Sequence, residues 1–210
     1  MNALSDLELA ALLCSRVCHD VISPVGAIAN GLEILADEDD EEMRQMAFDL
    51  LRRSAGQASA KLQFCRLAFG AAGSAGSTFD LGEAGDIARM FVGEEKIKLD
   101  WAMPHESRDK GEVKLLLNLM LMAMSAIPRG GLVTVGLDDG RLTVRATGDK
   151  AKLPDASMRV LAGDIDAAAI DARLVQVYYT TRLADQAGYA IDTEIGSDGL
   201  AIIATAKVHG

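Results

Sequence analysis

The sequence lacks the features that direct a chain to an oxidising compartment or into a membrane. It has only three cysteines in 210 residues, too few for a disulfide framework, so we expect reduced thiols. Its longest apolar run, 115–127, is too short to span a bilayer and includes Asn118. Residues 1–10 have no basic segment, so we expect no signal peptide and a cytoplasmic protein.

Positive charge is also scarce in this chain. It has 21 Lys and Arg against 31 Asp and Glu, and its formal net charge is -10. Because such a surface repels phosphate backbones and anionic lipids, we expect neither nucleic acid nor membrane as a partner. Half of the residues are hydrophobic, enough for a sizeable core, and the length fits two small domains.

The first domain, residues 1–72, is predicted to be a long antiparallel helical hairpin. Its first helix should begin at the capping box Ser5-Asp6-Leu7-Glu8. The acidic turn at 37–42 suits the N-terminus of a second helix, from Met43 to about Phe69. Apolar residues spaced by three or four mark one buried face of the first helix: Leu9, Leu13, Val17, Val21, Val25, Ile28, Leu32 and Leu35.

An isolated hairpin of this kind has an apolar face with nothing to cover it. Two copies packed side by side bury that face as a four-helix bundle. The pattern therefore predicts a homodimer.

The second domain, residues 73–210, follows a small, flexible segment at 70–77 and has a mixed α and β pattern. Expected helices cover residues 80–91, 112–127 and 167–187, and an expected strand covers 96–101. Two β-hairpins are expected, at 132–148 with a turn at Asp139-Gly140 and at 189–208 with a turn at Asp198-Gly199. The fold class is thus α+β, a helical hairpin followed by an α/β sandwich.

His19, on the first helix, is the leading candidate for chemistry. At about 100° per residue it lies opposite the centre of the apolar stripe, so its imidazole should stand in water. Small or polar neighbours surround it and would let a second protein approach: Ser15, Arg16, Ser23, Ala27 and Asn30.

Two features beside His19 bear on its role. Asp20 can orient the imidazole or accept its proton, and neutral imidazole is a nucleophile near neutral pH. Pro24 has no N–H, so the carbonyl of Asp20 loses its helical partner and the helix should bend there. The residues alone fit phosphoryl transfer to His19, and they fit equally a solvated histidine beside a tolerated proline.

Two motifs resemble those of histidine kinases. His19-Asp20-Val21-Ile22-Ser23-Pro24 resembles the H-box on the first dimerisation helix of these enzymes. Residues 116–135, "LLNLMLMAMSAIPRGGLVTV", resemble the N-box helix and following strand of the kinase ATP-binding domain, with Asn118 at the first conserved asparagine. The resemblance runs along nearly the whole chain in the same order.

The nucleotide-binding positions depart from the kinase pattern. Met122 stands where the magnesium-binding asparagine belongs, Ser125 where a basic residue is common, and Ala146 where an aspartate contacts adenine. The glycine-rich lid is replaced by 171–179, "DARLVQVYY", which has no glycine to let backbone amides approach phosphates. These departures imply that ATP is not bound.

A kinase-like hairpin with its histidine and a degenerate ATP-binding domain resembles the ChpT-type histidine phosphotransferases of the alphaproteobacterial cell-cycle relay. The resemblance implies transfer of phosphate from the receiver aspartate of a CckA-like hybrid kinase to CtrA-like and CpdR-like response regulators. By the family match His19 is the phosphorylated residue. We expect Asp20 to orient it and Arg16, Ser23, Ala27 and Asn30 to offer a docking surface. No cofactor is expected on this chain, since the receiver would bring its own magnesium.

Two other functions stay open, an active ATP-dependent histidine kinase and a non-catalytic dimeric adaptor. A metal site is not expected: Cys14 and Cys18 lie near the apolar stripe and should be buried thiols. His105 should be solvated, and the acidic turn at 37–42 should be a solvated helix cap.

Overall fold

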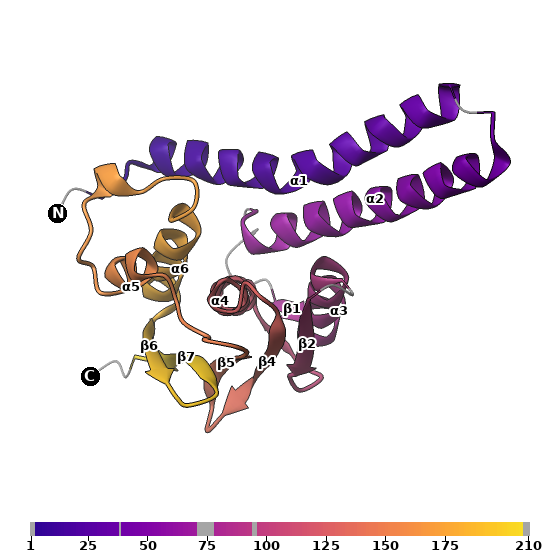
Figure 1. The fold of residues 1–210 in the computed structure, drawn as a ribbon. Helices are drawn as coiled ribbons and strands as arrows, with labels where there is room; N and C mark the ends of the chain where they lie inside the picture. Colours follow the sequence, from indigo (N-terminus) through magenta and orange to yellow (C-terminus); the bar gives the residue numbers. More distant parts are fainter. Residues whose placement is uncertain (1–2, 38, 71–77, 94–95, 208–210) are drawn as a thin grey trace.

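The computed structural model describes residues 3–37, 39–70, 78–93 and 96–207. Its N-terminal part is the predicted hairpin of two long helices, α1 (Asp6–Asp37) and α2 (Glu41–Ala68). Figure 1 shows this hairpin extending beyond the body of the molecule, with the axis of α1 changing direction near its middle. α1 remains a single helix through Pro24, which is buried.

The helix starts follow the predicted capping residues. Ser5 Oγ accepts a hydrogen bond from the Glu8 amide at 3.3 Å, and the Glu8 carboxylate accepts one from the Ser5 amide at 2.9 Å. This reciprocal pair is the capping box at the start of α1. At the start of α2, the Asp40 carboxylate accepts from the Met43 amide at 3.0 Å. The acidic turn is therefore used as a helix cap, as predicted.

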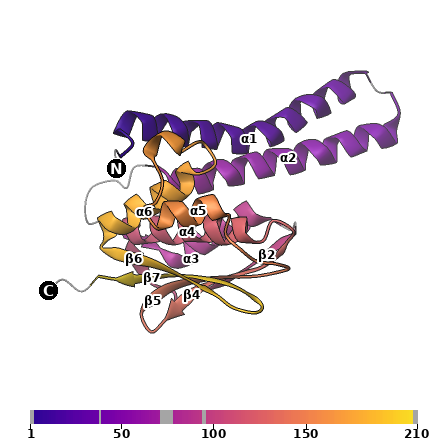
Figure 2. The same ribbon diagram turned by 60° about the vertical axis from the view of Figure 1, so that its left-hand side comes forward.

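The C-terminal part is a five-stranded sheet of order β2-β4-β5-β7-β6, with helices on one face. β2 and β4 pair in parallel, and the β4–β5, β5–β7 and β7–β6 pairs are antiparallel. Its strands are β2 (Ile97–Ala102), β4 (Gly131–Asp138), β5 (Arg141–Thr147), β6 (Tyr189–Ile195) and β7 (Gly199–Ala206). Its helices are α3 (Leu81–Val92), α4 (Lys110–Ala126), α5 (Asp155–Leu161) and α6 (Val175–Ala187). Figure 2 shows these helices as a layer between the sheet and the hairpin.

Most predicted elements of this part are present. The β4–β5 turn is at Asp139-Gly140, where φ is 50° and 77°, the positive values that a two-residue hairpin turn of type I′ requires. Gly188 ends α6 in the left-handed conformation, as expected. The second hairpin turns at 196–198, slightly before the predicted Asp198-Gly199, because Gly199 already pairs with Thr147.

The helix predicted over 167–187 is wrong in its first part. Residues 167–169 form a separate 3-10 turn, and α6 begins only at Val175. The Asp166 carboxylate accepts from the Ala168 amide, and the Asp171 carboxylate accepts from the Arg173 and Leu174 amides. Each aspartate thus offers the backbone a local turn in competition with a continuous helix.

Some elements were not predicted at all. They are α5 and the short antiparallel pair of β1 (Thr78–Asp80) and β3 (Ser107–Asp109). The predicted domain boundary at 72/73 lies outside the described residues.

The end of α2 is held on α4 by buried polar groups. Asn118 Nδ2 donates to the carbonyl oxygen of Ala68 at 3.0 Å, and Lys114 Nζ donates to the carbonyl of Gly70. Because the last carbonyls of a helix have no intrahelical partner, α4 supplies the donors that α2 lacks. The rings of Phe64 and Phe91 stack beside this contact with centroids 4.0 Å apart.

A matched pair of glycine substitutions tests this packing. A Cβ on Gly85 of α3 would lie 2.6 Å from the Trp101 ring, whose Nε1 donates to the Leu81 carbonyl at 3.0 Å. We predict that Gly85→Ala lowers the free energy of unfolding by about 1–3 kcal/mol, since the indole must shift. A Cβ on Gly56 of α2 meets nothing within 4 Å. Gly56→Ala should therefore raise the free energy of unfolding by roughly 0.5–1 kcal/mol.

Chemical denaturation of both variants at one protein concentration measures these changes. A Gly85→Ala variant as stable as Gly56→Ala would contradict this account of the α3–β2 contact.

Candidate functional site

His19 is a solvent-exposed side chain on α1 that lies beside the carboxylate of Asp20. Its side chain is 83% exposed, and Nδ1 lies 3.3 Å from Oδ1 of Asp20. The other oxygen of that carboxylate, Oδ2, accepts from Nε of Arg16 at 2.9 Å. Asp20 and Arg16 are far less exposed, at 23% and 29%. The Arg16 guanidinium therefore holds one oxygen of the Asp20 carboxylate, and the other oxygen faces the imidazole.

This arrangement distinguishes the two ring nitrogens of His19. With the proton on Nδ1, the ring donates to Asp20, and Nε2 keeps its lone pair. Within the part of the chain that the structure describes, Nδ1 is the ring nitrogen with a polar partner. An imidazole held in this way offers Nε2 to an approaching electrophile.

The proposed docking residues differ in their exposure to solvent. Ser23 and Asn30 are exposed, as the helical projection predicted, whereas Ala27 is partly buried. The Arg16 head group is engaged by Asp20. Ser23 and Asn30 therefore leave a low surface beside the ring.

The buried Cys65 of α2 lies near the Asp20 and Arg16 charges. Burial, and next the nearby Asp20 carboxylate, raise the pKa of the Cys65 thiol to about 11. This thiol stays protonated at neutral pH and is a poor nucleophile. Of the Cys65 and His19 side chains, the exposed imidazole is the better nucleophile at neutral pH.

The other cysteines correct an expectation. Cys14 and Cys18 are exposed in the single chain, not buried, because their side of α1 is not covered by α2. No group of three or more His, Cys, Asp or Glu side chains could hold a metal ion among the residues that the structure describes. His105 is exposed, as expected.

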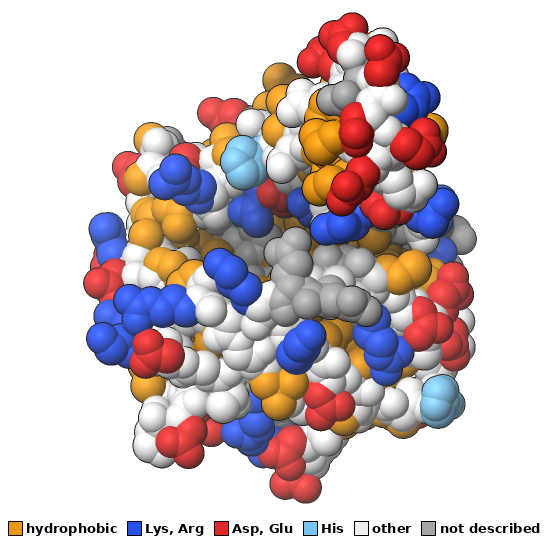
Figure 3. Space-filling view, turned by 45° about the vertical axis from the view of Figure 1, so that its right-hand side comes forward, with side chains coloured by type: hydrophobic (Ala, Val, Ile, Leu, Met, Phe, Trp, Pro, Cys, Tyr) orange, Lys and Arg blue, Asp and Glu red, His pale blue; other side chains and the backbone are white. Residues whose placement is uncertain are grey.

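The hairpin has a stripe of exposed apolar side chains away from the second domain. On α1 it includes Leu7, Val25 and Leu32, which are 81%, 49% and 57% exposed. On α2 it includes Phe48 and Leu62, which are 49% and 51% exposed. Figure 3 shows hydrophobic side chains on the surface of the hairpin and acidic ones gathered at its tip. We call these five residues the hairpin stripe.

By length and composition α1 could cross a membrane, although the apolar runs of the sequence predicted no span. Most of its apolar surface is exposed in the single chain. One such helix near the N-terminus is weak evidence for a span, and the same helix packs along α2 through Gly31, which meets Leu51. The uncovered apolar area is the hairpin stripe.

The positions that resemble a nucleotide site are filled with buried side chains. Met122 and Ala146 are 0% and 1% exposed, and Val175 and Val177 at the start of α6 are buried. The Asn118 amide donates within the protein and accepts from Gln176 Nε2 at 3.2 Å. These side chains belong to the hydrophobic core or to its polar contacts.

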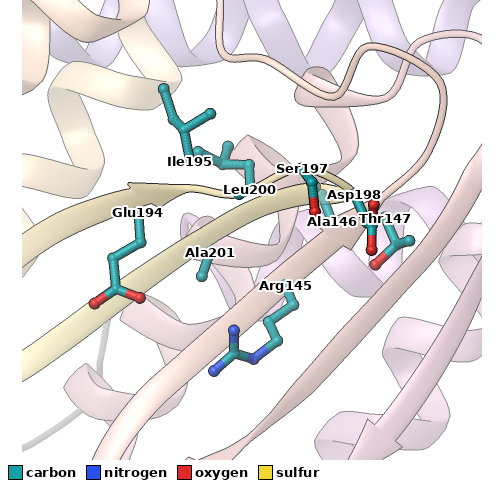
Figure 4. Close-up of a pocket in the computed structure, with 11 residues that line it drawn as sticks. Arg145, Ala146, Thr147, Glu194, Ile195, Ser197, Asp198, Leu200 and Ala201 are labelled. Carbon is teal, nitrogen blue, oxygen red and sulfur yellow. The ribbon is translucent and has the colours of Figure 1, made fainter.

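A shallow hollow lies elsewhere, at the turn end of the β6–β7 hairpin. It has a volume of about 350 Å³ and is lined by residues 145–147 and 194–201. Figure 4 shows Arg145 and Glu194 on one side of these strands, with Ile195 and Leu200 on the other. The lining includes none of Asn118, Met122 or residues 171–179.

Comparisons with known proteins agree on one family. The model of the histidine phosphotransferase C-terminal domain matches residues 81–199. Protein phosphotransferase ChpT of Brucella abortus (strain 2308) is 46% identical over 196 residues, 90% of each chain. A solved bacterial phosphotransferase is 39% identical, with a TM-score of 0.87 over 97% of this chain and 98% of its own.

Histidine kinases are less similar in structure. The Acinetobacter baumannii histidine kinase AdeS matches 91% of this chain and 98% of its own at 10% identity, with a TM-score of 0.44. The high coverage and identity of the two phosphotransferases extend from the hairpin through the sheet. The chain is a phosphotransferase, and it belongs to the histidine phosphotransferase family whose members act in phosphorelays.

Proposed function

We propose that this chain carries phosphoryl groups through His19, from the receiver aspartate of a CckA-like hybrid kinase to CtrA-like and CpdR-like response regulators. The observation that carries the proposal is the exposed imidazole with Nδ1 facing Asp20 at 3.3 Å. Such a relay of the cell cycle operates among cytoplasmic receivers, and we infer the same location for this chain.

The transfer is a displacement at phosphorus. The lone pair on Nε2 of His19 forms the N–P bond while the O–P bond of the receiver's aspartyl phosphate breaks. The receiver's aspartate leaves as a carboxylate. The phosphorylated ring carries a positive charge with its proton on Nδ1, and the adjacent Asp20 carboxylate stabilises that charge. In the second half-reaction the aspartate of another receiver attacks the same phosphorus, and the neutral imidazole is restored.

The chain contributes no cofactor to this scheme. Loose phosphoryl transfer depends on positioning and on neutralising charge around the phosphoryl oxygens. The receiver supplies magnesium and the acidic side chains that bind it. The phosphotransferase supplies an oriented ring and a surface low enough for a second protein, which Ser23 and Asn30 provide beside His19.

We propose further that the kinase-like domain does not bind ATP. The magnesium-binding asparagine is replaced by the fully buried Met122, and the adenine-contacting aspartate by the buried Ala146. In the lid position, Asp171 caps a tight turn that leads directly into α6. An alternative function as an ATP-dependent kinase would need a polar cleft where these apolar side chains pack.

The active form is proposed to be a homodimer. The hairpin stripe exposes large apolar side chains on both α1 and α2, and contiguous exposed apolar area marks an interaction site. A second hairpin would cover it as a four-helix bundle. His19 lies on a different side of α1, so it stays accessible in the dimer.

The first prediction from the proposed function concerns the phosphoacceptor. His19→Gln should abolish phosphoryl transfer and change the free energy of unfolding by under about 0.5 kcal/mol, since the side chain is exposed. Asp20→Asn keeps the nucleophile but loses the charge facing Nδ1, so transfer should slow by roughly 10- to 1,000-fold. A time course of phosphate loss from a phosphorylated receiver measures both, and thermal melts check folding.

Phosphorylation of the His19→Gln variant would contradict the assignment. Loss of folding in that variant would contradict the exposed position of the ring.

The second prediction concerns nucleotide binding. Calorimetric titration with ATP and magnesium should give no heat of binding at millimolar nucleotide, with an active histidine-kinase ATP-binding domain as the positive control. Met122→Asn should not restore binding, because the glycine-free segment at 171–179 remains. Micromolar affinity in the wild type would favour the ATP-dependent kinase instead.

The third prediction concerns the dimer. Leu32→Asp should place a charge in the buried bundle, cost about 2–4 kcal/mol and shift the protein to monomer. Asn30→Asp adds the same charge on the exposed polar side and should leave the dimer intact. Light scattering measures the mass, and a wild-type mass equal to the 22.2 kDa of one chain would contradict the bundle.

A further inference from the structure

We propose that Arg16 is a positioning residue for phosphoryl transfer, acting on His19 through Asp20. The inference rests on the proposed function, since it concerns the reactivity of His19. It differs from the docking role that the sequence suggested for Arg16. The observation behind it is the continuous chain of contacts from Arg16 Nε to Asp20 Oδ2, and from Asp20 Oδ1 to His19 Nδ1, at 2.9 and 3.3 Å.

Helix geometry explains why Asp20 needs a second partner. Neighbouring residues on a helix do not face each other, whereas residues four apart do. Asp20 therefore packs over Arg16 and reaches the adjacent His19 only sideways. Because Arg16 takes Oδ2, the carboxylate plane is fixed with Oδ1 toward the imidazole. Without Arg16, rotation about the Asp20 side chain would carry Oδ1 away from Nδ1.

Burial supports this division of roles. The side chains of Arg16 and Asp20 are 29% and 23% exposed, while that of His19 is 83% exposed. A residue that binds a partner directly would present its charged head to solvent. The Arg16 head group is instead engaged within its own helix and partly covered.

The ion pair of Arg16 and Asp20 also affects the protonation of His19. On α2, Cys65 lies near Asp20 and Arg16, and Lys61 lies near Cys65. Burial, and next the Asp20 charge, raise the pKa of the Cys65 thiol to about 11. The thiol is neutral at physiological pH, so it does not compensate the carboxylate. Arg16 is the cation in hydrogen-bond contact with Asp20. Without Arg16 the negative charge of Asp20 is no longer neutralised. Even with Oδ1 turned away from Nδ1, that charge lies beside the ring and favours the protonated imidazolium, which is not a nucleophile.

Four variants test the proposal: Arg16→Met, Arg16→Lys, Asp20→Asn and the double variant Arg16→Met/Asp20→Asn. Arg16→Met should slow transfer roughly 10-fold at saturating receiver, less than the loss of the carboxylate itself, with an unchanged receiver KM. The acidic limb of the pH–rate profile of Arg16→Met should move to higher pH, because a higher pH is needed to deprotonate the imidazolium. Arg16→Lys keeps the charge and should keep that limb in place, with the rate partly restored.

The double variant separates positioning from docking. If Arg16 acts only through Asp20, adding Arg16→Met to Asp20→Asn should slow transfer no further. Additive losses, or a raised receiver KM with an unchanged kcat, would show that Arg16 contacts the receiver and would overturn the proposal. Arg129→Met is the matched control, since Arg129 forms an ion pair with Asp149 on another element, and it should leave transfer unchanged.

Nitrogen NMR of His19 provides a readout that needs no receiver. The neutral ring should carry its proton mainly on Nδ1 in the wild type and lose this preference in Arg16→Met. An unchanged tautomer ratio in a folded Arg16→Met variant would overturn the inference. If that variant does not fold, Arg16→Lys carries the test through its partial rate and weakened tautomer preference.

Different results would contradict this inference and the proposed function. Wild-type protein that takes no phosphate on His19 would contradict the function itself. Wild-type protein that is phosphorylated there, while Arg16→Met matches its rate and pH profile, would contradict only the role of Arg16.

Discussion

The buried amide of Asn118 joins the parts of the molecule. It lies on α4, donates to the Ala68 carbonyl at the end of α2, and accepts from Gln176 on α6. Left unpaired in the core, these groups would each cost about 1–3 kcal/mol, so their pairing fixes how the hairpin sits on the helical layer. In the kinase-like pattern this asparagine belongs to the nucleotide box. Here it holds the hairpin, and Lys114 adds a donor to Gly70. The second domain thus serves as a rigid support for α2.

The hairpin divides its surface into three parts with different chemistry. One side packs on α4 and α3 through Phe64 and the end of α2. A second side is the hairpin stripe, whose apolar side chains are exposed in the single chain and which we propose a second copy covers. The third side presents His19 among small polar residues. Because helical residues three or four apart share a side, the period of 3.6 residues separates these three surfaces. His19 therefore lies apart from both apolar surfaces.

Local signals made much of the fold predictable. The capping box at Ser5 and Glu8 and the Asp139-Gly140 turn depend on neighbouring residues alone, and both are present. The strands β1 and β3 could not be found, because three-residue strands take their stability from a partner almost thirty residues away in the chain. Only the first part of the helix predicted over 167–187 was wrong, because its alanines favour helix while Asp166 and Asp171 bond the local backbone.

The same distinction applies to the site. The position of His19 opposite the apolar stripe followed from helical periodicity. The cysteines were misplaced because a projection of one helix shows which side is apolar, but not whether α2 or another chain covers it. The ion pair of Arg16 and Asp20 could have been predicted from their spacing of four residues on a helix. Its connection to His19 required the actual position of the carboxylate.

We propose that Nε2 of His19 is the atom that carries the phosphoryl group. Mass-spectrometric mapping, combined with phosphorus NMR of the protein after incubation with a phosphorylated receiver domain, locates the phosphate. We expect an acid-labile phosphate on His19 alone, bonded to Nε2. Phosphate on Nδ1, or on another residue while His19 stays unmodified, would contradict it.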